Sequence, residues 1–322
     1  MRVLFQNRPK HLWQGGDYVQ LEATAEALRK KGVEVEISDQ MIYVPALKYR
    51  NFDLIHTWNF SMPWTPYQMG LAFMYKKPNV CSMIYHNRSD FVSWRDQQDM
   101  AERMDEAVFI NEGEVQRFRD KLFIPDSKVS IIPNGIDEFW FSKVKVKKDL
   151  RPFVLSVGRI ETHKGQLGVA KACKELGIKY LMVGDAKDNL YLKLCEEAGA
   201  IHEGNKDRAE LIKLYAASGC LVLNSKAEIQ PLTIMEAGAQ AKNIVVAKGC
   251  LWKVPNANWV DCDNISQLKE AILKALSDKP NTELRDWLKQ YTWDKVADEY
   301  LKIYQKALDK HKGQPAFVWQ TK

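Results

Sequence analysis

Two glutamates stand eight positions apart in the segment SKAEIQPLTIMEAGAQA, at Glu228 and Glu236. The pattern predicts a loop that carries Glu228 and a helix over residues 233–241 that carries Glu236. Carboxylates in a binding cleft accept hydrogen bonds from sugar or ribose hydroxyl groups. The amide groups of Leu232 and Thr233, at the helix N-terminus, offer donors to a phosphate. Taken alone, the spacing is more typical of solvent-facing charges.

A second segment, SVGRIETHKGQ, ends a predicted strand at Gly158 and places Arg159 and Lys164 beside the start of a helix. Glycine permits close approach of the backbone to a ligand, and two cations can neutralise a diphosphate. The charge on a departing diphosphate grows as its bond to a sugar breaks, so fixed cations stabilise the transition state more than the ground state. Ordinary surface cations beside a turn remain the alternative.

Short apolar strands that alternate with helical patterns must position these segments. The first half has predicted strands at residues 3–5, 33–37, 54–56, 80–85, 107–110 and 129–132, with a helix at 18–31. The second half has predicted strands at residues 153–157, 180–183, around 202, 221–223 and 244–247. Its predicted helices lie at residues 166–176, 190–198, 208–217 and 233–241, and residues 265–311 are largely helical. Such alternation predicts two parallel sheets covered by helices.

The length of 322 residues predicts two domains. We expect an α/β protein with two Rossmann-like domains, residues 1–145 and 146–294, that face each other across a cleft holding the active site. A helix over about residues 295–322 is expected to pack back on the first domain. The basic run KVKVKKDLR, residues 143–151, is interpreted as the linker.

The composition is that of an ordinary globular protein, with 46% hydrophobic and 27% charged residues. The net charge of +6 is spread over both halves. Six cysteines without a CxxC pair indicate neither a zinc site nor a disulfide framework, so we expect a cytoplasmic protein. We also expect no signal peptide and no transmembrane segment, while contact with a membrane surface stays open.

Three ordered motifs resemble the signatures of family-4 retaining glycosyltransferases of the GT-B fold. They are SIIPNGID at residues 130–137, VGRIETHKG at 157–165 and the stretch from Glu228 to Glu236. Weaker landmarks are also similar to those of the family: the Gly15-Gly16 pair, FDLIHTW at 52–58, LIKLYAASGCLVLNS at 211–225 and WDKVADEYLKIYQKAL near the end.

The resemblance implies a donor site for a nucleoside-diphosphate sugar in the second domain. Arg159 and Lys164 would contact the diphosphate, Glu236 the ribose and Glu228 the transferred sugar. Gly158 would let the backbone approach the ligand. UDP and GDP sugars both remain open.

The first domain would complete the site. By resemblance, Gly15 and Gly16 border the donor phosphates and the acceptor. His86 is the candidate for the histidine that faces the transferred sugar, and a structural, hydrogen-bonded histidine is the alternative.

The implied mechanism retains the anomeric configuration by front-face attack, in which the departing phosphate helps to deprotonate the acceptor. We expect neither a cofactor nor a metal, because the single Asp-x-Asp match, at residues 261–263, is more typical of a surface turn. The chain departs from the family pattern at Gln230 and Pro231. Proline lacks an N–H, so one potential phosphate donor is lost there.

The acceptor is less defined, and a glycan or another molecule with a free hydroxyl fits the chemistry. Trp13, Trp58, Trp64 and Arg88 are candidates for contacting it, since aromatic rings stack on sugars and bases alike. Each ring taken singly is more typical of a protein core.

Three alternatives stay open. The acceptor could be a hydroxylated base in DNA, which would need basic flanks and give steep salt dependence. The chain could also be a GT-B epimerase or a nucleotide-sugar binder without activity. A nicotinamide oxidoreductase is disfavoured, because no G-x-G-x-x-G follows the first strand.

Overall fold

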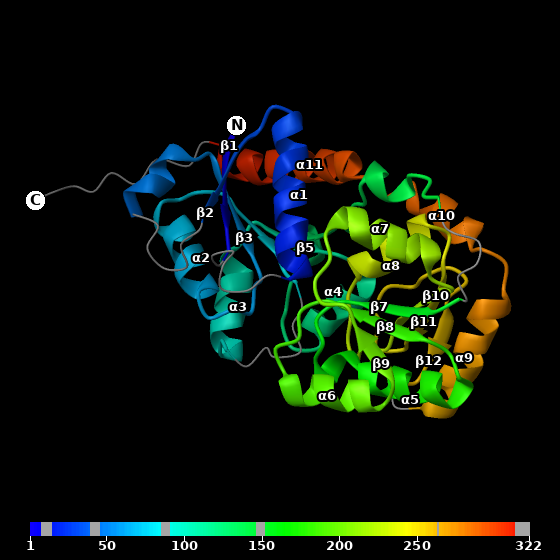
Figure 1. Ribbon diagram of the computed structural model, residues 1–322. Coiled ribbons are helices and arrows are strands. Elements are labelled where there is room, and N and C mark those ends of the chain that lie inside the picture. Colours follow the sequence, from blue (N-terminus) through cyan, green and yellow to red (C-terminus); the bar gives the residue numbers. More distant parts are fainter. Residues whose placement is uncertain (8–14, 39–45, 85–90, 146–151, 263, 313–322) are drawn as a thin grey trace, which may run out of the picture. The chain divides into compact units, whose positions relative to one another are not determined.

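The structure is a computed structural model that describes residues 1–7, 15–38, 46–84, 91–145, 152–262 and 264–312 (Figure 1). The chain forms two compact units. Unit 1 comprises Met1–Gly135 and Tyr291–Lys322, and unit 2 comprises Ile136–Gln290. The sequence placed the first boundary later, after residue 145, and the second after residue 294.

Unit 1 is built on a six-stranded parallel sheet with the order β2-β1-β3-β4-β5-β6. The strands are β1 (Arg2–Gln6), β2 (Glu34–Ser38), β3 (Leu54–Trp58), β4 (Asn79–Ser82), β5 (Glu106–Phe109) and β6 (Val129–Ile131). All pairs are parallel, and β1, β3, β4 and β5 are almost wholly buried. Burial on both faces explains their continuous apolar runs.

The helices of unit 1 lie on both faces of this sheet. They are α1 (Gly16–Lys30), α2 (Thr65–Met74), α3 (Trp94–Arg103), α4 (Glu112–Arg119) and α11 (Trp293–His311). Three 3-10 turns, η2 (Ala46–Asn51), η3 (Asp126–Lys128) and η4 (Glu138–Phe141), lie in connecting segments, the last of them in unit 2.

Helix α11 belongs to unit 1 although it follows unit 2 in the chain. It packs on α1, where Lys31 Nζ lies 2.9 Å and 2.7 Å from carboxylate oxygens of Asp294 and Asp298. Its Tyr304 hydroxyl lies 2.7 Å from Nδ1 of the fully buried His56 on β3. Burial lowers the pKa of His56 to about 3, so this histidine is a neutral core residue.

Unit 2 has a second six-stranded parallel sheet, in the order β12-β11-β10-β7-β8-β9. Its strands are β7 (Val154–Val157), β8 (Tyr180–Val183), β9 (Ala200–His202), β10 (Cys220–Leu223), β11 (Asn243–Ala247) and β12 (Asn258–Val260). From β7 the chain adds β8 and then β9 on one side of the sheet, and from β10 it adds β11 and then β12 on the other side. The order therefore reverses between β7 and β10, which is where doubly wound sheets bind ligands.

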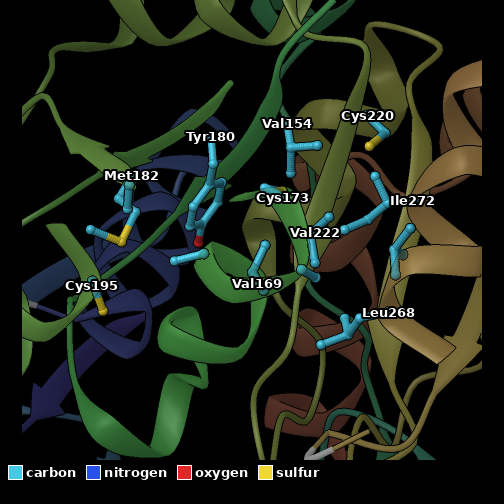
Figure 2. Packing of buried hydrophobic residues seen from close by; sticks show 14 of the residues in the cluster. Val154, Val169, Cys173, Tyr180, Met182, Cys195, Cys220, Val222, Leu268 and Ile272 are labelled. Carbon is cyan, nitrogen blue, oxygen red and sulfur yellow. The ribbon is translucent and has the colours of Figure 1, made fainter. Parts of the chain in front are cut away.

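Helices cover both faces of the second sheet, with α7 and α8 above it and α5, α6 and α9 below it in Figure 1. Their bounds are η5 (Thr162–Lys164), α5 (Gln166–Leu176), α6 (Asn189–Glu197), α7 (Arg208–Ala217), α8 (Leu232–Ala239), α9 (Ile265–Ser277) and α10 (Thr282–Leu288). Figure 2 shows part of the core between the sheet and helices α5 and α9, where Val169 and Leu268 pack with Val154, Tyr180 and Val222 from the strands.

The architecture confirms the predicted α/β fold with two parallel sheets. Some boundaries differ. The strand predicted at 80–85 ends at Ser82, and β12 was not predicted because Asn258 and Trp259 are only partly buried and lack an apolar run. Among the described residues, no helix is both long enough and apolar enough to cross a bilayer.

Candidate functional site

The end of β7 and the turn that follows it carry two of the predicted cations. Gly158 donates its N–H to Val183 O at 2.8 Å, which keeps the chain beside β8. Arg159 comes next and places Nη1 2.9 Å from Glu161 Oε1, with the arginine side chain 30% exposed. The guanidinium is thus held in place by one carboxylate while part of it stays accessible.

Lys164 is presented by a turn that only glycine can close. Gly165 has φ of +69° and is the N-cap of α5, and a Cβ there would lie 2.3 Å from Asn224 O. The Asn224 side chain, just after β10, donates to Gly165 O at 3.0 Å and to Cys262 O at 2.8 Å. Asn224 therefore ties the lysine turn to the carboxyl end of β10.

Lys164 and Glu228 form an ion pair, with Nζ 2.6 Å from Oε1. Their side chains are 19% and 16% exposed, so both groups are largely withdrawn from solvent. The backbone of Glu228 is fixed on both sides: its N–H donates to Gly249 O at 3.3 Å and its carbonyl accepts from Leu251 N–H at 2.8 Å. The pair joins segments 64 residues apart, at the point where the strand order reverses.

Glu236 lies on α8, separate from that pair. The Tyr215 hydroxyl donates to its Oε2 at 2.7 Å, and burial raises the pKa of Glu236 to about 7. The positive charge of Arg208 lowers the pKa of Glu236, whereas the negative charge of Asp137 raises it. Arg208 and Asp137 form an ion pair with each other, with Nη2 2.5 Å from Oδ2. A carboxyl group that titrates near neutrality beside a phenol and a guanidinium is suited to binding a diol.

The N-terminus of α8 begins at Leu232, with Pro231 as the N-cap residue. Leu232 and Thr233 are therefore the first two helical residues, and their amide groups have no acceptor within the helix. Because the proline lies at the cap, its missing N–H does not interrupt the helix. The helix was predicted to start one residue later.

The structure places the candidate site residues of unit 1 in different settings. Gly15 is the N-cap of α1, and Gly16 is its exposed first residue. Trp13, His86 and Arg88 lie outside the described residues. Trp64 is partly buried. Trp58 is fully buried on β3 and stacks with His56 at 4.7 Å between ring centroids, so it is a core residue and has no face for an acceptor.

Tyr215, Asn224, Gly249 and Leu251 were missed by the sequence analysis. Tyr215 and Asn224 stand in the LIKLYAASGCLVLNS landmark, but nothing in its spacing indicates that they bond Glu236 and Gly165. The others act through contacts between segments far apart in the chain. Among the described residues, no three His, Cys, Asp or Glu side chains are grouped to hold a metal ion, and Asp261 pairs with the exposed Lys248.

Comparison with protein families identifies the chain. Residues 138–294 match the model for glycosyl transferases group 1, and residues 43–138 match the model for glycosyltransferase family 4. The chain belongs to the family-4-like glycosyltransferases of the GT-B fold. The match to the group 1 model contains Arg159, Lys164, Glu228 and Glu236.

Two curated relatives match part of the chain. One is an N,N'-diacetylbacillosaminyl-diphospho-undecaprenol alpha-1,3-N-acetylgalactosaminyltransferase of Campylobacter jejuni, 28% identical over 62% of this chain and 60% of that protein. The other is an uncharacterised glycosyltransferase of Methanocaldococcus jannaschii, 26% identical over 58% of this chain and 56% of that protein. The chain thus spans less than two thirds of the length of these relatives.

Solved structures share the fold over nearly the whole length of the chain. HepE of Anabaena, in complex with UDP, has a TM-score of 0.77 at 16% identity and covers 95% of this chain and all of its own. Sucrose-phosphate synthase of Thermosynechococcus elongatus has a TM-score of 0.77 at 15% identity, covering 96% and 99%.

Proposed function

We propose that this protein transfers a sugar from a nucleoside-diphosphate sugar to a hydroxyl group of a glycan, with retention of the anomeric configuration. The Lys164–Glu228 pair carries the proposal. It brings together a cation and a carboxylate from two distant motifs at the switch point of the sheet in unit 2.

Each side chain has a role that follows from its charge and setting. Arg159 and Lys164 bind the diphosphate, and Lys164 stabilises the charge that develops on it as the glycosidic bond breaks. Glu228 is already held beside that lysine, so it would accept hydrogen bonds from hydroxyl groups of the transferred sugar close to the phosphate. Glu236 binds the ribose hydroxyls, and the amides of Leu232 and Thr233 add donors to a phosphate.

The nucleotide base is read by backbone groups at the ends of β8 and β9. Gly184 N–H donates to Gly204 O at 2.9 Å, and His202 Nε2 lies 2.7 Å from Gly184 O. These two bonds fix the main chain just after β8, the strand next to β7. Because HepE was solved with UDP, UDP is the first nucleotide to test.

The reaction is proposed to need neither cofactor nor metal, because Arg159 and Lys164 supply the positive charge that a divalent ion would otherwise give to the diphosphate. Attack from the front face lets the departing phosphate accept the acceptor proton, and His86 is retained as the candidate that faces the sugar. We also keep the proposal that Gly15 and Gly16 of unit 1 lie beside the donor phosphates and the acceptor.

The test is turnover of a panel of nucleotide sugars, followed by release of nucleoside diphosphate, with NMR of the new linkage. We expect one donor to be consumed, a product with the donor's anomeric configuration, and no loss of rate with a chelator. Lys164→Met should lower kcat by about 10²- to 10³-fold, whereas Lys193→Met, an exposed lysine of α6, should not. Inversion, or chelator-sensitive turnover, would contradict the mechanism.

A further inference from the structure

Glu161 holds two basic side chains at once. Its Oε1 lies 2.9 Å from Arg159 Nη1, and its Oε2 lies 3.2 Å from His163 Nδ1. The carboxylate is 21% exposed, whereas the imidazole is 44% exposed. One carboxylate therefore places the accessible ring of His163 next to the guanidinium that is proposed to bind the diphosphate.

The backbone of His163 is fixed as well. Its carbonyl accepts the N–H of Lys226 at 2.9 Å, which ties η5 to the segment that leads to Glu228. The residue directly precedes Lys164, so the ring lies between the two proposed diphosphate cations along the chain.

The charges around His163 are balanced in the absence of a ligand. Arg159 and Lys164 face it as cations, and Glu161 and Glu228 face it as anions. Partial burial, with Lys164 and Arg159, lowers the pKa of the ring, while the two glutamates oppose this change. A pKa below its usual value favours the neutral form of the His163 imidazole at neutral pH in the free protein.

A bound diphosphate would reverse that balance, because it adds at least two negative charges beside two cations already paired with Glu161 and Glu228. A neutral imidazole is the one group of this cluster that can gain positive charge near neutral pH. Protonation would then let the ring donate a charge-assisted hydrogen bond.

We propose that His163 is a third cationic contact of the donor diphosphate and that it takes up a proton from solvent when the nucleotide binds. The inference rests on the proposed donor site. His163 returns the proton when the nucleoside diphosphate leaves, so binding and release of the nucleotide are linked to pH.

The experiment is calorimetric titration of the protein with UDP at pH 7, in buffers of different ionisation enthalpy, which counts the protons taken up. For each UDP bound, wild type should take up at least about 0.5 proton more than the His163→Gln variant does. The difference cancels the protons exchanged by Glu236 and by UDP itself. His311→Gln, a histidine of unit 1, should match wild type.

Affinity separates a charge role from a purely structural one. His163→Gln should bind UDP about two- to fivefold more weakly at pH 6.5 and nearly normally at pH 8. His163→Lys, which is always charged, should restore the affinity with no extra proton uptake. Equal uptake in wild type and His163→Gln would overturn the proposal.

Two outcomes keep the proposals separate. If UDP fails to bind wild type and the other nucleoside diphosphates fail too, the donor site itself is wrong. If UDP binds wild type but His163→Gln does not fold, NMR titration of the His163 ring in wild type decides: its pKa must rise on adding UDP, and an unchanged pKa contradicts the inference.

Discussion

At the scale of single residues, the Lys164–Glu228 pair is both a structural bond and the proposed centre of donor binding. Its 2.6 Å contact and low exposure predict a coupling that a surface pair would lack. In a double-mutant cycle with Lys164→Met and Glu228→Gln, we expect a coupling of about 1–2 kcal/mol in the free energy of unfolding. The exposed pair of Lys302 and Glu299 is the control. Simple additivity of the two changes would show that the pair is not formed.

Glu236 gives a pH-dependent prediction. Burial raises its pKa from 4.5 to about 7, so the folded state binds this proton more tightly than the unfolded chain. Its contribution to stability is full below pH 4.5 and is lost as the pH rises through 7. The free energy of unfolding of wild type, measured relative to Glu236→Gln, should fall by up to about 1.4 kcal/mol per pH unit in that window.

The control for Glu236 is Glu299→Gln, a half-exposed glutamate of α11. Its difference from wild type should stay flat over the same range. A flat difference for Glu236→Gln as well would mean that the carboxyl group is not buried as described.

At the scale of elements, the turn into α5 decides where Lys164 points. Gly165 and Gly177 flank the same helix with φ of +69° and +66°, but only at Gly165 would a Cβ meet other atoms, at 2.3 Å from Asn224 O. Gly177→Ala should lower the free energy of unfolding by about 1–2 kcal/mol, because alanine is strained in the left-handed backbone conformation. Gly165→Ala should lower the free energy of unfolding clearly more, because its Cβ would also collide with Asn224, and it should weaken nucleotide binding as well. Thermal unfolding with and without UDP measures both, and equal effects of the two changes would contradict this account.

The sequence located the elements of the site better than its contacts. The apolar periodicity predicted helix 208–217 and helix 166–176 at their observed bounds, and it placed Arg159 and Lys164 after a strand. It could not show that Asn224 bonds Gly165 or that Tyr215 bonds Glu236, because those contacts depend on which strands and which helices become neighbours. The roles of the site residues themselves stay predictions.

At the scale of the whole molecule, helix α11 is fastened to unit 1 by an ion cluster. Glu106, at the start of β5, is fully buried, and its two carboxylate oxygens lie 2.8 Å and 2.7 Å from Lys306 and Lys310 Nζ. Replacing both lysines by Met leaves the carboxylate buried without these cations. We expect a loss of about 3 kcal/mol from unit 1, read from hydrogen exchange of the β4 and β5 amides.

Two comparisons test the cause of that loss. Glu106→Gln added to the double variant should recover part of the stability, since no charge is then left buried. Lys302→Met on the same helix, 70% exposed, should change stability by no more than about 0.5 kcal/mol. If the double variant is as stable as wild type, α11 is held by its apolar and aromatic contacts alone.

The alternating pattern of the chain was enough to predict two parallel sheets and the fold class. It was not enough to separate core aromatics from surface ones. Trp58 looks like a loop residue in the sequence because β3 continues two residues beyond the predicted strand, and only the packing against His56 and Tyr300 shows that it is buried.

The most direct test of the donor site is thermal unfolding of the protein against UDP, GDP, ADP and dTDP sugars. We predict that one nucleotide sugar raises the melting temperature, by the equivalent of about 2.7 kcal/mol at a concentration of 100 Kd. Lys164→Met and Glu236→Gln should respond far less, and Lys193→Met fully. If no nucleotide sugar stabilises wild type, or if all variants respond alike, the assignment of this donor site is contradicted.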